Sequence, residues 1–320
     1  MIPAQGDRVG RPCPDQEGDG RVRRAGELTS PSLFGSLWAY VEVTKPASVL
    51  LLVFTGLAAM IVAAGGLDLP PGLLVRILPA LALGCAGANT LTCYIDRDMD
   101  LVMVRTRGRP IPSGRIRPSE RALYWGILLT VVSLALAWTI NPLVFLLGLL
   151  GFADNVLVYS LLLKRRSAWN IILGGFSGGI PVLSGWAALR GEIDLTALLI
   201  AAVVVLWIPN HIWNLAIYHA DDYRRVHVPM LPAVVSLEKT TRCTMATVML
   251  MYLLSLALYF VGGFGLIYLA VAFIFGLFVT VSNFVLALHP SREKSWVMFK
   301  LSSPYLFVLF LAMAIDVLLV

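Results

Sequence analysis

Long apolar runs separated by short polar segments make up most of this chain from residue 47 onward. A helix that crosses a lipid bilayer needs roughly 20 consecutive, predominantly apolar residues. The runs that satisfy this requirement cover residues 47–66, 73–95, 120–140, 142–163, 168–188, 195–218, 241–261, 264–288 and 299–319. The pattern therefore predicts an all-α polytopic membrane protein with about nine transmembrane helices.

The segment that precedes the first apolar run has a different composition. Residues 1–35 are rich in Gly, Pro and charged residues of both signs, and they contain no long apolar stretch. A segment of this kind does not bury enough apolar surface to fold by itself. We expect a disordered tail over residues 1–35, followed by one transmembrane domain over residues 36–320.

The composition excludes a soluble enzyme of this length. Hydrophobic residues make up 58% of the chain and charged residues only 14%, whereas soluble domains carry about 25% charged residues. The net charge of +6 does not indicate a nucleic-acid partner, because the basic residues stand in the short segments between apolar runs. The partner that this composition predicts is the lipid bilayer.

The distribution of basic residues predicts how the chain is oriented. If the N-terminus is cytoplasmic, the cytoplasmic segments hold all of the 25 Lys and Arg residues except Arg76 and Arg190. Cytoplasmic loops of membrane proteins carry such an excess of positive charge. We therefore expect a multi-pass protein of the cell membrane with a cytoplasmic N-terminus. The longer polar segments, and with them the active site, then lie at the cytoplasmic face.

The second predicted span runs into an aspartate-rich segment. Asp96 and Asp100 are four residues apart, so a helix places both carboxylates on one face, whereas Asp98 points elsewhere. Two carboxylates on one face persist most readily when a cation compensates them, and Mg²⁺ takes one or two carboxylates together with water and phosphate oxygens. The simpler alternative is an interfacial charged loop that ends a helix. The candidates here are Asp96 and Asp100 as Mg²⁺ ligands, with Asn89, Thr92, Arg105 and Arg109 as diphosphate-binding neighbours.

A second acidic segment ends the sixth predicted span, where Asp221, Asp222 and Tyr223 are followed by two arginines. Two acidic sites on separate helices suit two Mg²⁺ ions that share one diphosphate. Asp221 and Asp222, with Tyr223 beside them, are the candidate residues of this second acidic site. His211 lies deeper in the same span beside Pro209, and either a substrate contact or a structural hydrogen bond explains it.

Three further polar features lie at or within the spans. Lys164 follows the fourth span and acts either as a phosphate ligand or as an anchor at the membrane surface. Asp154 is an acid inside a predicted span, and such residues are functional candidates. Asp316 stands near the outer end of the last span, where we expect it to reach the interface.

At these residues the chain resembles the UbiA superfamily of intramembrane prenyltransferases, from about Tyr40 to the C-terminus. The superfamily's first motif starts with Asn, where this chain has Thr92, and Asn89 one turn earlier is a candidate substitute. The last groups of residues in the list below resemble the branch that modifies haem. The resemblance rests on Val43-Thr44-Lys45-Pro46, Tyr94 to Asp100, Arg105-Thr106, Arg109-Pro110, Tyr159-Ser160, Lys164-Arg165-Arg166-Ser167, Gly174-Gly175, Gly178, Pro181, Gly185-Trp186, Trp207, Pro209, His211, Trp213, Asp222-Tyr223 and Pro229-Met230-Leu231-Pro232.

The resemblance implies helices around a central cavity, with a Mg²⁺–diphosphate site under a cytoplasmic cap. It also implies farnesyl diphosphate as donor, haem B as acceptor and a later haem-modifying enzyme as a partner. Mg²⁺ then compensates the charge that develops on the leaving diphosphate while an allylic cation forms. The implied catalytic residues are Asp96, Asp100, Asp222, Tyr159 and Lys164, with the three aspartates as the Mg²⁺ ligands. The implied substrate contacts include Lys45, Ser160, His211, Trp207, Trp213, Asp221 and Tyr223. Tyr159 and the tryptophans then stabilise the cation with their π faces.

Two alternatives remain open. The same reaction class can act on another acceptor, such as a quinone precursor or a glycerol lipid. A transporter also has broken helices and polar residues, but these gather near the middle of the membrane. Here the acids gather at one membrane face, and this disfavours transport.

Overall fold

The computed structural model describes residues 33–319, and within this range it consists of helices and the loops that join them. Nine of these helical segments are long and apolar enough to cross a membrane, as the hydropathy pattern predicts. Most of the predicted tail, residues 1–32, lies outside the described residues. The first described helix already begins at Leu33, inside the segment that we expected to be disordered.

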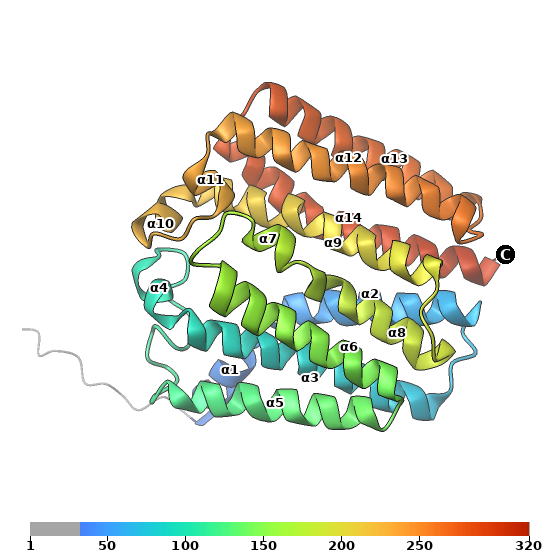
Figure 1. Ribbon diagram of the computed structural model, residues 1–320, viewed down its shortest axis with the longest axis horizontal. Coiled ribbons are helices and arrows are strands. Elements are labelled where there is room, and N and C mark those ends of the chain that lie inside the picture. Colours follow the sequence, from blue (N-terminus) through green and yellow to red (C-terminus); the bar gives the residue numbers. More distant parts are fainter. Residues whose placement is uncertain (1–32, 320) are drawn as a thin grey trace, which may run out of the picture.

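The helices follow one another in a simple order along the chain (Figure 1). Four of them are short and lie beside or between the spans: α1 (Leu33–Glu42), α4 (Arg97–Val102), α10 (Ala220–Arg225) and α11 (Leu231–Val234). The membrane-crossing parts are α2 (Pro46–Ala64), α3 (Pro71–Ile95), α5 (Glu120–Trp138), α6 (Pro142–Phe152) with η1 (Ala153–Leu163), α7 (Asn170–Leu173) and η2 (Phe176–Gly179) with α8 (Ile180–Arg190), α9 (Leu195–Tyr218), α12 (Leu237–Val261), α13 (Leu266–Leu288) and α14 (Arg292–Leu319).

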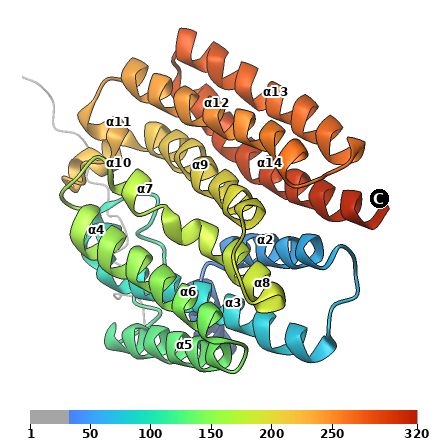
Figure 2. The ribbon, with the colours of Figure 1, turned by 45° about the vertical axis from the view of Figure 1, so that its right-hand side comes forward.

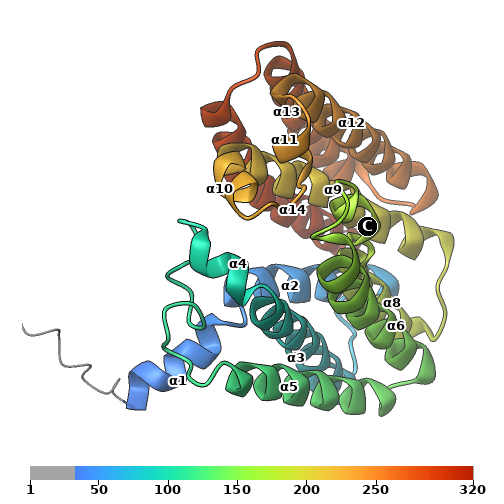
Figure 3. The same ribbon diagram turned by 60° about the vertical axis from the view of Figure 1, so that its left-hand side comes forward.

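The spans form two groups that meet along α2, α8, α9 and α14. One group consists of α2, α3, α5, α6 and α8, and the other of α9, α12, α13 and α14. In the second group α12 and α13 lie on the outside, beyond α9 and α14 (Figure 2). The short helices α1, α4, α10 and α11 gather at one end of the bundle, and the C-terminus lies at the other (Figures 1 and 3).

Small residues allow two helices of the first group, α2 and α8, to approach each other closely. A Cβ atom built on Gly185 would lie 2.9 Å from the carbonyl carbon of Gly56 and closer still to its oxygen. Membrane helices gain little from the hydrophobic effect when they associate, so close backbone packing at small residues holds them together instead. Glycine at position 185 is therefore required by the backbone of the neighbouring helix.

The fourth and fifth spans are irregular, and the sequence pattern did not predict this. The fourth span changes from an α-helix to a π-helix at Ala153. The fifth span is broken into α7, η2 and α8, with Gly174 and Gly175 at the first break. The carboxylate of Asp154, at the start of the π-helix, accepts a hydrogen bond of 2.7 Å from the backbone N–H of Ser177. The intramembrane acid therefore has a partner that stabilises the broken backbone of the next span.

The expectation for Asp316 was wrong. Its side chain is buried, and its carboxylate accepts hydrogen bonds from the backbone N–H groups of Gly265 and Tyr268. These groups belong to the first turn of α13, whose N–H groups have no partners within the helix. Asp316 thus caps a neighbouring helix and does not reach the interface.

Candidate functional site

A large central cavity of about 1050 Å³ lies between the two groups of helices. Its wall comes from α2, α3, α5, α6, η1, the broken fifth span, α9 and α14, together with the short helices α4 and α10, and none of its described lining residues belongs to α12 or α13. It extends from Lys45 and Arg109, at the end where the short helices gather, to Ala137 and Val144 near the opposite end of the spans. Polar residues concentrate at the first end, so the cavity has a polar mouth and an apolar interior.

The aspartate-rich segment forms one side of the mouth. α3 ends at Ile95, and Asp96 forms the junction to α4. Its backbone N–H still donates to Thr92, and the N–H of Asp100 donates to Asp96, so the four-residue spacing of a helix is kept. Four candidate residues from this part of the chain all line the cavity: Asn89, Thr92, Asp96 and Asp100.

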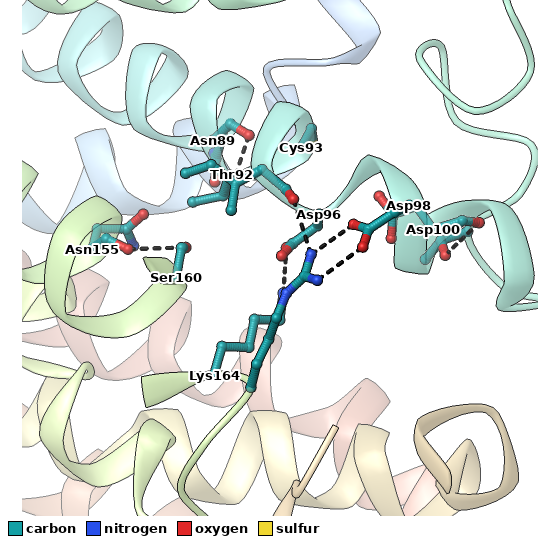
Figure 4. A network of polar contacts seen from close by, with 12 residues as sticks. Asn89, Thr92, Cys93, Asp96, Asp98, Asp100, Asn155, Ser160 and Lys164 are labelled. Carbon is teal, nitrogen blue, oxygen red and sulfur yellow. Dashed lines mark hydrogen bonds and ion pairs between the residues drawn. The ribbon is translucent and has the colours of Figure 1, made fainter. Parts of the chain in front are cut away.

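The carboxylates of this segment are paired with basic side chains, and Figure 4 shows this for Asp96 and Lys164. Asp96 forms an ion pair with Lys164 at the end of η1, and Asp100 accepts hydrogen bonds of 2.8 and 3.1 Å from Arg109. Asp98 behaves differently, because its side chain is 60% exposed and pairs with Arg165 outside the cavity. Asp96 and Asp100 thus face the cavity and Asp98 points away from it, as the four-residue spacing predicts.

The donor set at this side fits Mg²⁺ that is shared with a diphosphate. One carboxylate oxygen of Asp96, Oδ1, is buried without a hydrogen-bond partner, which is costly for a charged group unless a ligand satisfies it. The side-chain amide of Asn89 donates to the carbonyl of Thr44, so its carbonyl oxygen remains available at the cavity. Within residues 33–319 no three His, Cys, Asp or Glu side chains cluster as a complete metal site. Mg²⁺ needs only one or two carboxylates when phosphate oxygens fill other positions.

Lys45 stands at the mouth in a strained backbone conformation. Its φ angle of 57° lies in the left-handed region, which non-glycine residues rarely adopt. The hydrogen bond from Asn89 to the carbonyl of Thr44 holds this corner against α3. Burial, together with the nearby cations Arg109 and Lys164, lowers the pKa of Lys45. Its ammonium group has no ion-pair partner among the residues that the structure describes, so it is available to an anion.

Cations outnumber anions around the cavity mouth. The charged lining residues are the basic Lys45, Arg105, Arg109 and Lys164 and the acidic Asp96 and Asp100. Burial acts to lower the pKa of Lys164, but the carboxylate of Asp96 is among the neighbours that outweigh it, and the net shift is upward. Lys164 therefore remains protonated at neutral pH. A mouth with this excess of positive charge is suited to a multiply charged anion.

The second acidic segment reaches the same mouth from a distant part of the chain. The backbone N–H of Arg105, in the loop after α4, donates to Asp222 of α10 at 3.4 Å. Arg105 also places its guanidinium 3.5 Å from the hydroxyl of Tyr223. Figure 3 shows α4 and α10 at the same end of the bundle. Asp222 is buried just behind the lining residues Arg105 and Tyr223, so the two predicted acidic segments meet in the structure.

Some candidate residues lie outside the cavity wall. Asp221 is 58% exposed and pairs with Arg224 and Arg292 on the surface. Trp213 is buried in an apolar cluster with Met99 and Tyr223, behind the wall. Ser160 donates to the carbonyl of Asn155 and lines a smaller, open pocket beside the π-helix. The structure thus gives these three no contact with the central cavity, whereas Tyr159, Trp207 and His211 do line it.

The structure adds lining residues for which the sequence carried little signal. Phe299 and Phe307 of α14 add aromatic rings to the lining of the cavity, and Ser177 of the broken fifth span also lines it. Aromatic residues in a membrane helix are too common to stand out in a sequence. The break itself had a signal, because paired glycines at Gly174-Gly175 interrupt an apolar run.

Comparison with known proteins agrees with this geometry. The model of the UbiA prenyltransferase family matches residues 50–312. The chain belongs to this family. A protoheme IX farnesyltransferase of Desulforudis audaxviator is 51% identical over 98% of this chain and 99% of its own length. Another protoheme IX farnesyltransferase, from Symbiobacterium thermophilum, is 42% identical over 87% of this chain and 93% of its own.

Solved structures of UbiA proteins share the fold. A digeranylgeranylglyceryl phosphate synthase has a TM-score of 0.74 at 18% identity and covers 89% of this chain and 99% of its own. A UbiA homolog from Archaeoglobus fulgidus, bound to GPP and Mg²⁺, has a TM-score of 0.62 at 15% identity and covers 86% of this chain and 99% of its own. At these identities the likeness establishes the helical architecture alone.

Proposed function

We propose that this UbiA protein transfers the farnesyl group of farnesyl diphosphate to a vinyl group of haem B and thereby produces haem O. The observation that carries the proposal is a cationic mouth, with two inward carboxylates, above a large apolar cavity. Such a site binds a diphosphate at one end and two hydrophobic molecules at the other. The acceptor follows from the relatives with the highest identities given above, which are named protoheme IX farnesyltransferases.

The charged residues at the mouth hold the diphosphate. Mg²⁺ held by Asp96 and Asp100, with Asp222 beside them, would neutralise charge on the leaving group. Lys164 and Arg109 now pair with these carboxylates, and they become available to phosphate oxygens once a cation satisfies the acids. Lys45 does not have to leave a carboxylate first, because its ammonium group has no ion-pair partner among the described residues. The proposed diphosphate site thus uses both charge signs of the mouth.

The apolar interior favours the carbon–carbon bond formation. The bond between C1 of the farnesyl chain and the diphosphate oxygen breaks, and the electron pair leaves with the diphosphate. The terminal vinyl carbon of haem attacks C1, and the positive charge moves to the vinyl carbon next to the ring. A water molecule adds there and releases a proton, which completes the hydroxyethylfarnesyl side chain. Tyr159 and Trp207 line the cavity and present π faces that stabilise a passing cation.

Mass spectrometry of extracted haems tests the proposal. We expect haem O in cells that express this protein and only haem B in matched cells that do not. The purified protein with farnesyl diphosphate, Mg²⁺ and haem B should form the same product in detergent. Prenylation of a quinone precursor or a glycerol lipid without any haem O would contradict the acceptor but keep the reaction class. Solute uptake into proteoliposomes without prenyl transfer would contradict both.

We further propose that the mouth faces the cytoplasm, because nearly all basic residues lie at that end. In a background in which the four cysteines are replaced by serine, single cysteines at Ser113 or Glu238 should react with an impermeant thiol reagent only from the cytoplasmic side. A cysteine at Glu192, in the loop between α8 and α9, should react only from outside. The reverse labelling pattern would overturn the orientation.

A further inference from the structure

His211 occupies the cavity wall on α9, away from the charged mouth. Trp207 stacks on one face of its ring, with centroids 4.7 Å apart and an interplanar angle of 21°. Phe299 covers it from α14 at 4.5 Å and 38°. Aromatic rings from both α9 and α14 therefore pack against the imidazole.

The hydrogen-bond network determines which ring nitrogen carries the proton. The hydroxyl of Ser302 donates to the backbone carbonyl of Phe299 at 2.6 Å. The same hydroxyl oxygen lies 2.7 Å from Nδ1 of His211. A hydroxyl has one hydrogen, which is already used, so Ser302 accepts and Nδ1 of His211 is the donor. In the neutral ring, Nε2 then carries a free lone pair.

The Nε2 atom has no partner among residues 33–319. The residue lines the cavity, so a bound molecule can reach the free edge of the ring. A purely structural role, in which His211 pins α9 to α14, does not require this arrangement. Trp207 already joins the two helices, because its indole N–H donates to the carbonyl of Ser302 at 2.8 Å.

A neutral imidazole with an unprotonated Nε2 is a metal ligand, and it is the commonest axial ligand of haem iron. Histidines that bind metals usually donate their other ring N–H to a neighbouring acceptor, which fixes the ring. His211 has this arrangement, with Ser302 as the acceptor and two aromatic rings as supports. We infer that Nε2 of His211 binds the iron of the acceptor haem, an assignment that rests on the proposed function.

The position of His211 along α9 suits this role. It lies seven residues before the end of α9 at Tyr218, which is a depth of ~10 Å at ~1.5 Å per residue. The iron lies at the centre of a porphyrin and the vinyl groups at its edge. An iron ligand must therefore lie deeper in the cavity than the vinyl carbon that meets C1 of the farnesyl chain. His211 lies deeper along α9 than the charged mouth, as such an iron ligand must.

Haem and metal-free protoporphyrin IX together test the assignment. Purified wild type, His211→Ala and His211→Gln are titrated with haem by absorbance and with protoporphyrin IX by fluorescence. We expect either substitution to weaken haem binding at least tenfold and to change the Soret band, whereas protoporphyrin IX affinity changes less than about twofold. Added imidazole should restore the wild-type spectrum of His211→Ala. Farnesyl diphosphate affinity, measured by calorimetry with Mg²⁺, should stay unchanged.

The control is His289→Ala, because His289 is exposed at the end of α13 and lies outside the cavity. It should leave haem binding and the spectrum as in wild type. An unchanged Soret band and affinity in folded His211→Gln would overturn the inference, and so would equal losses of haem and protoporphyrin IX. These results leave the proposed function intact if wild type still forms haem O. If wild type binds no haem and forms no haem O, the proposed function itself fails.

Discussion

Replacing Asp96 with Asn should lower prenyl transfer at least ~100-fold, equivalent to ~2.7 kcal/mol in the activation barrier. The substitution keeps the size of the side chain and removes the charge of the buried carboxylate whose Oδ1 has no partner. It also leaves Lys164 without its ion-pair partner. The measurement is turnover of farnesyl diphosphate at saturating Mg²⁺ in detergent, with thermal unfolding to show that the variant is folded. Asp222→Asn should have the same effect.

The same motif supplies the control. Asp98 is two residues away and carries the same charge, but it is exposed and pairs with Arg165 outside the cavity. An exposed ion pair contributes little to stability, roughly 0–1 kcal/mol. Asp98→Asn should therefore keep turnover within about threefold of wild type. Turnover of Asp96→Asn within about tenfold of wild type, ~1.4 kcal/mol, would remove the inward carboxylates from the catalytic site.

Adding a single methyl group at Gly185 should destabilise the fold more than any comparable change on the helix surfaces. The new Cβ atom would lie 2.9 Å from the carbonyl carbon of Gly56 and nearer to its oxygen. Backbone atoms of α2 cannot rotate away as a side chain can, so α2 and α8 must separate. Overpacking of this kind costs about 1–3 kcal/mol, and we expect Gly185→Ala to lower the unfolding temperature by roughly 2–10 °C.

Gly72→Ala is the matched control for this prediction. Gly72 lies in the first turn of α3, and a Cβ atom built there meets nothing within 4 Å. Alanine favours a helix over glycine by up to about 1 kcal/mol, so this variant should be as stable as wild type or slightly more stable. Both variants are compared by thermal unfolding and size-exclusion chromatography in the same detergent. Equal unfolding temperatures for the two would show that α2 and α8 do not pack as tightly as the structure indicates.

The sequence alone determined the membrane class and the positions of the spans. Every helix that crosses a bilayer must be long enough and apolar enough to span its hydrocarbon core. The length and hydropathy of a sequence segment therefore suffice to recognise a span. The spacing of the carboxylates is also a property of a single helix. A helix repeats its face after about four residues, and this already separated Asp96 and Asp100 from Asp98. The sequence also led us to expect that the two acidic segments act together, because two acidic helix ends suit two Mg²⁺ ions that share one diphosphate.

The tertiary structure decided the features that depend on which helices are neighbours. Lys164 had two explanations, and its ion pair with Asp96, 68 residues away, places it at the cavity mouth. The adjacent acids Asp221 and Asp222 look equivalent in sequence, but the packing of α10 leaves one exposed and buries the other. Asp316 was expected at the interface because its capping of α13 cannot be recognised from its own segment.

The direction of the lone pair on His211 is the clearest case of this kind. It depends on a hydroxyl of α14, 91 residues away, and on the carbonyl to which that hydroxyl donates. Hydropathy and periodicity describe how each residue relates to its solvent and to its own helix. Hydrogen-bond direction, ion pairing and close backbone contact depend on distances between helices. No local pattern contains those distances, so the sequence predicted which residues carry the chemistry and the fold decided which of them face one another.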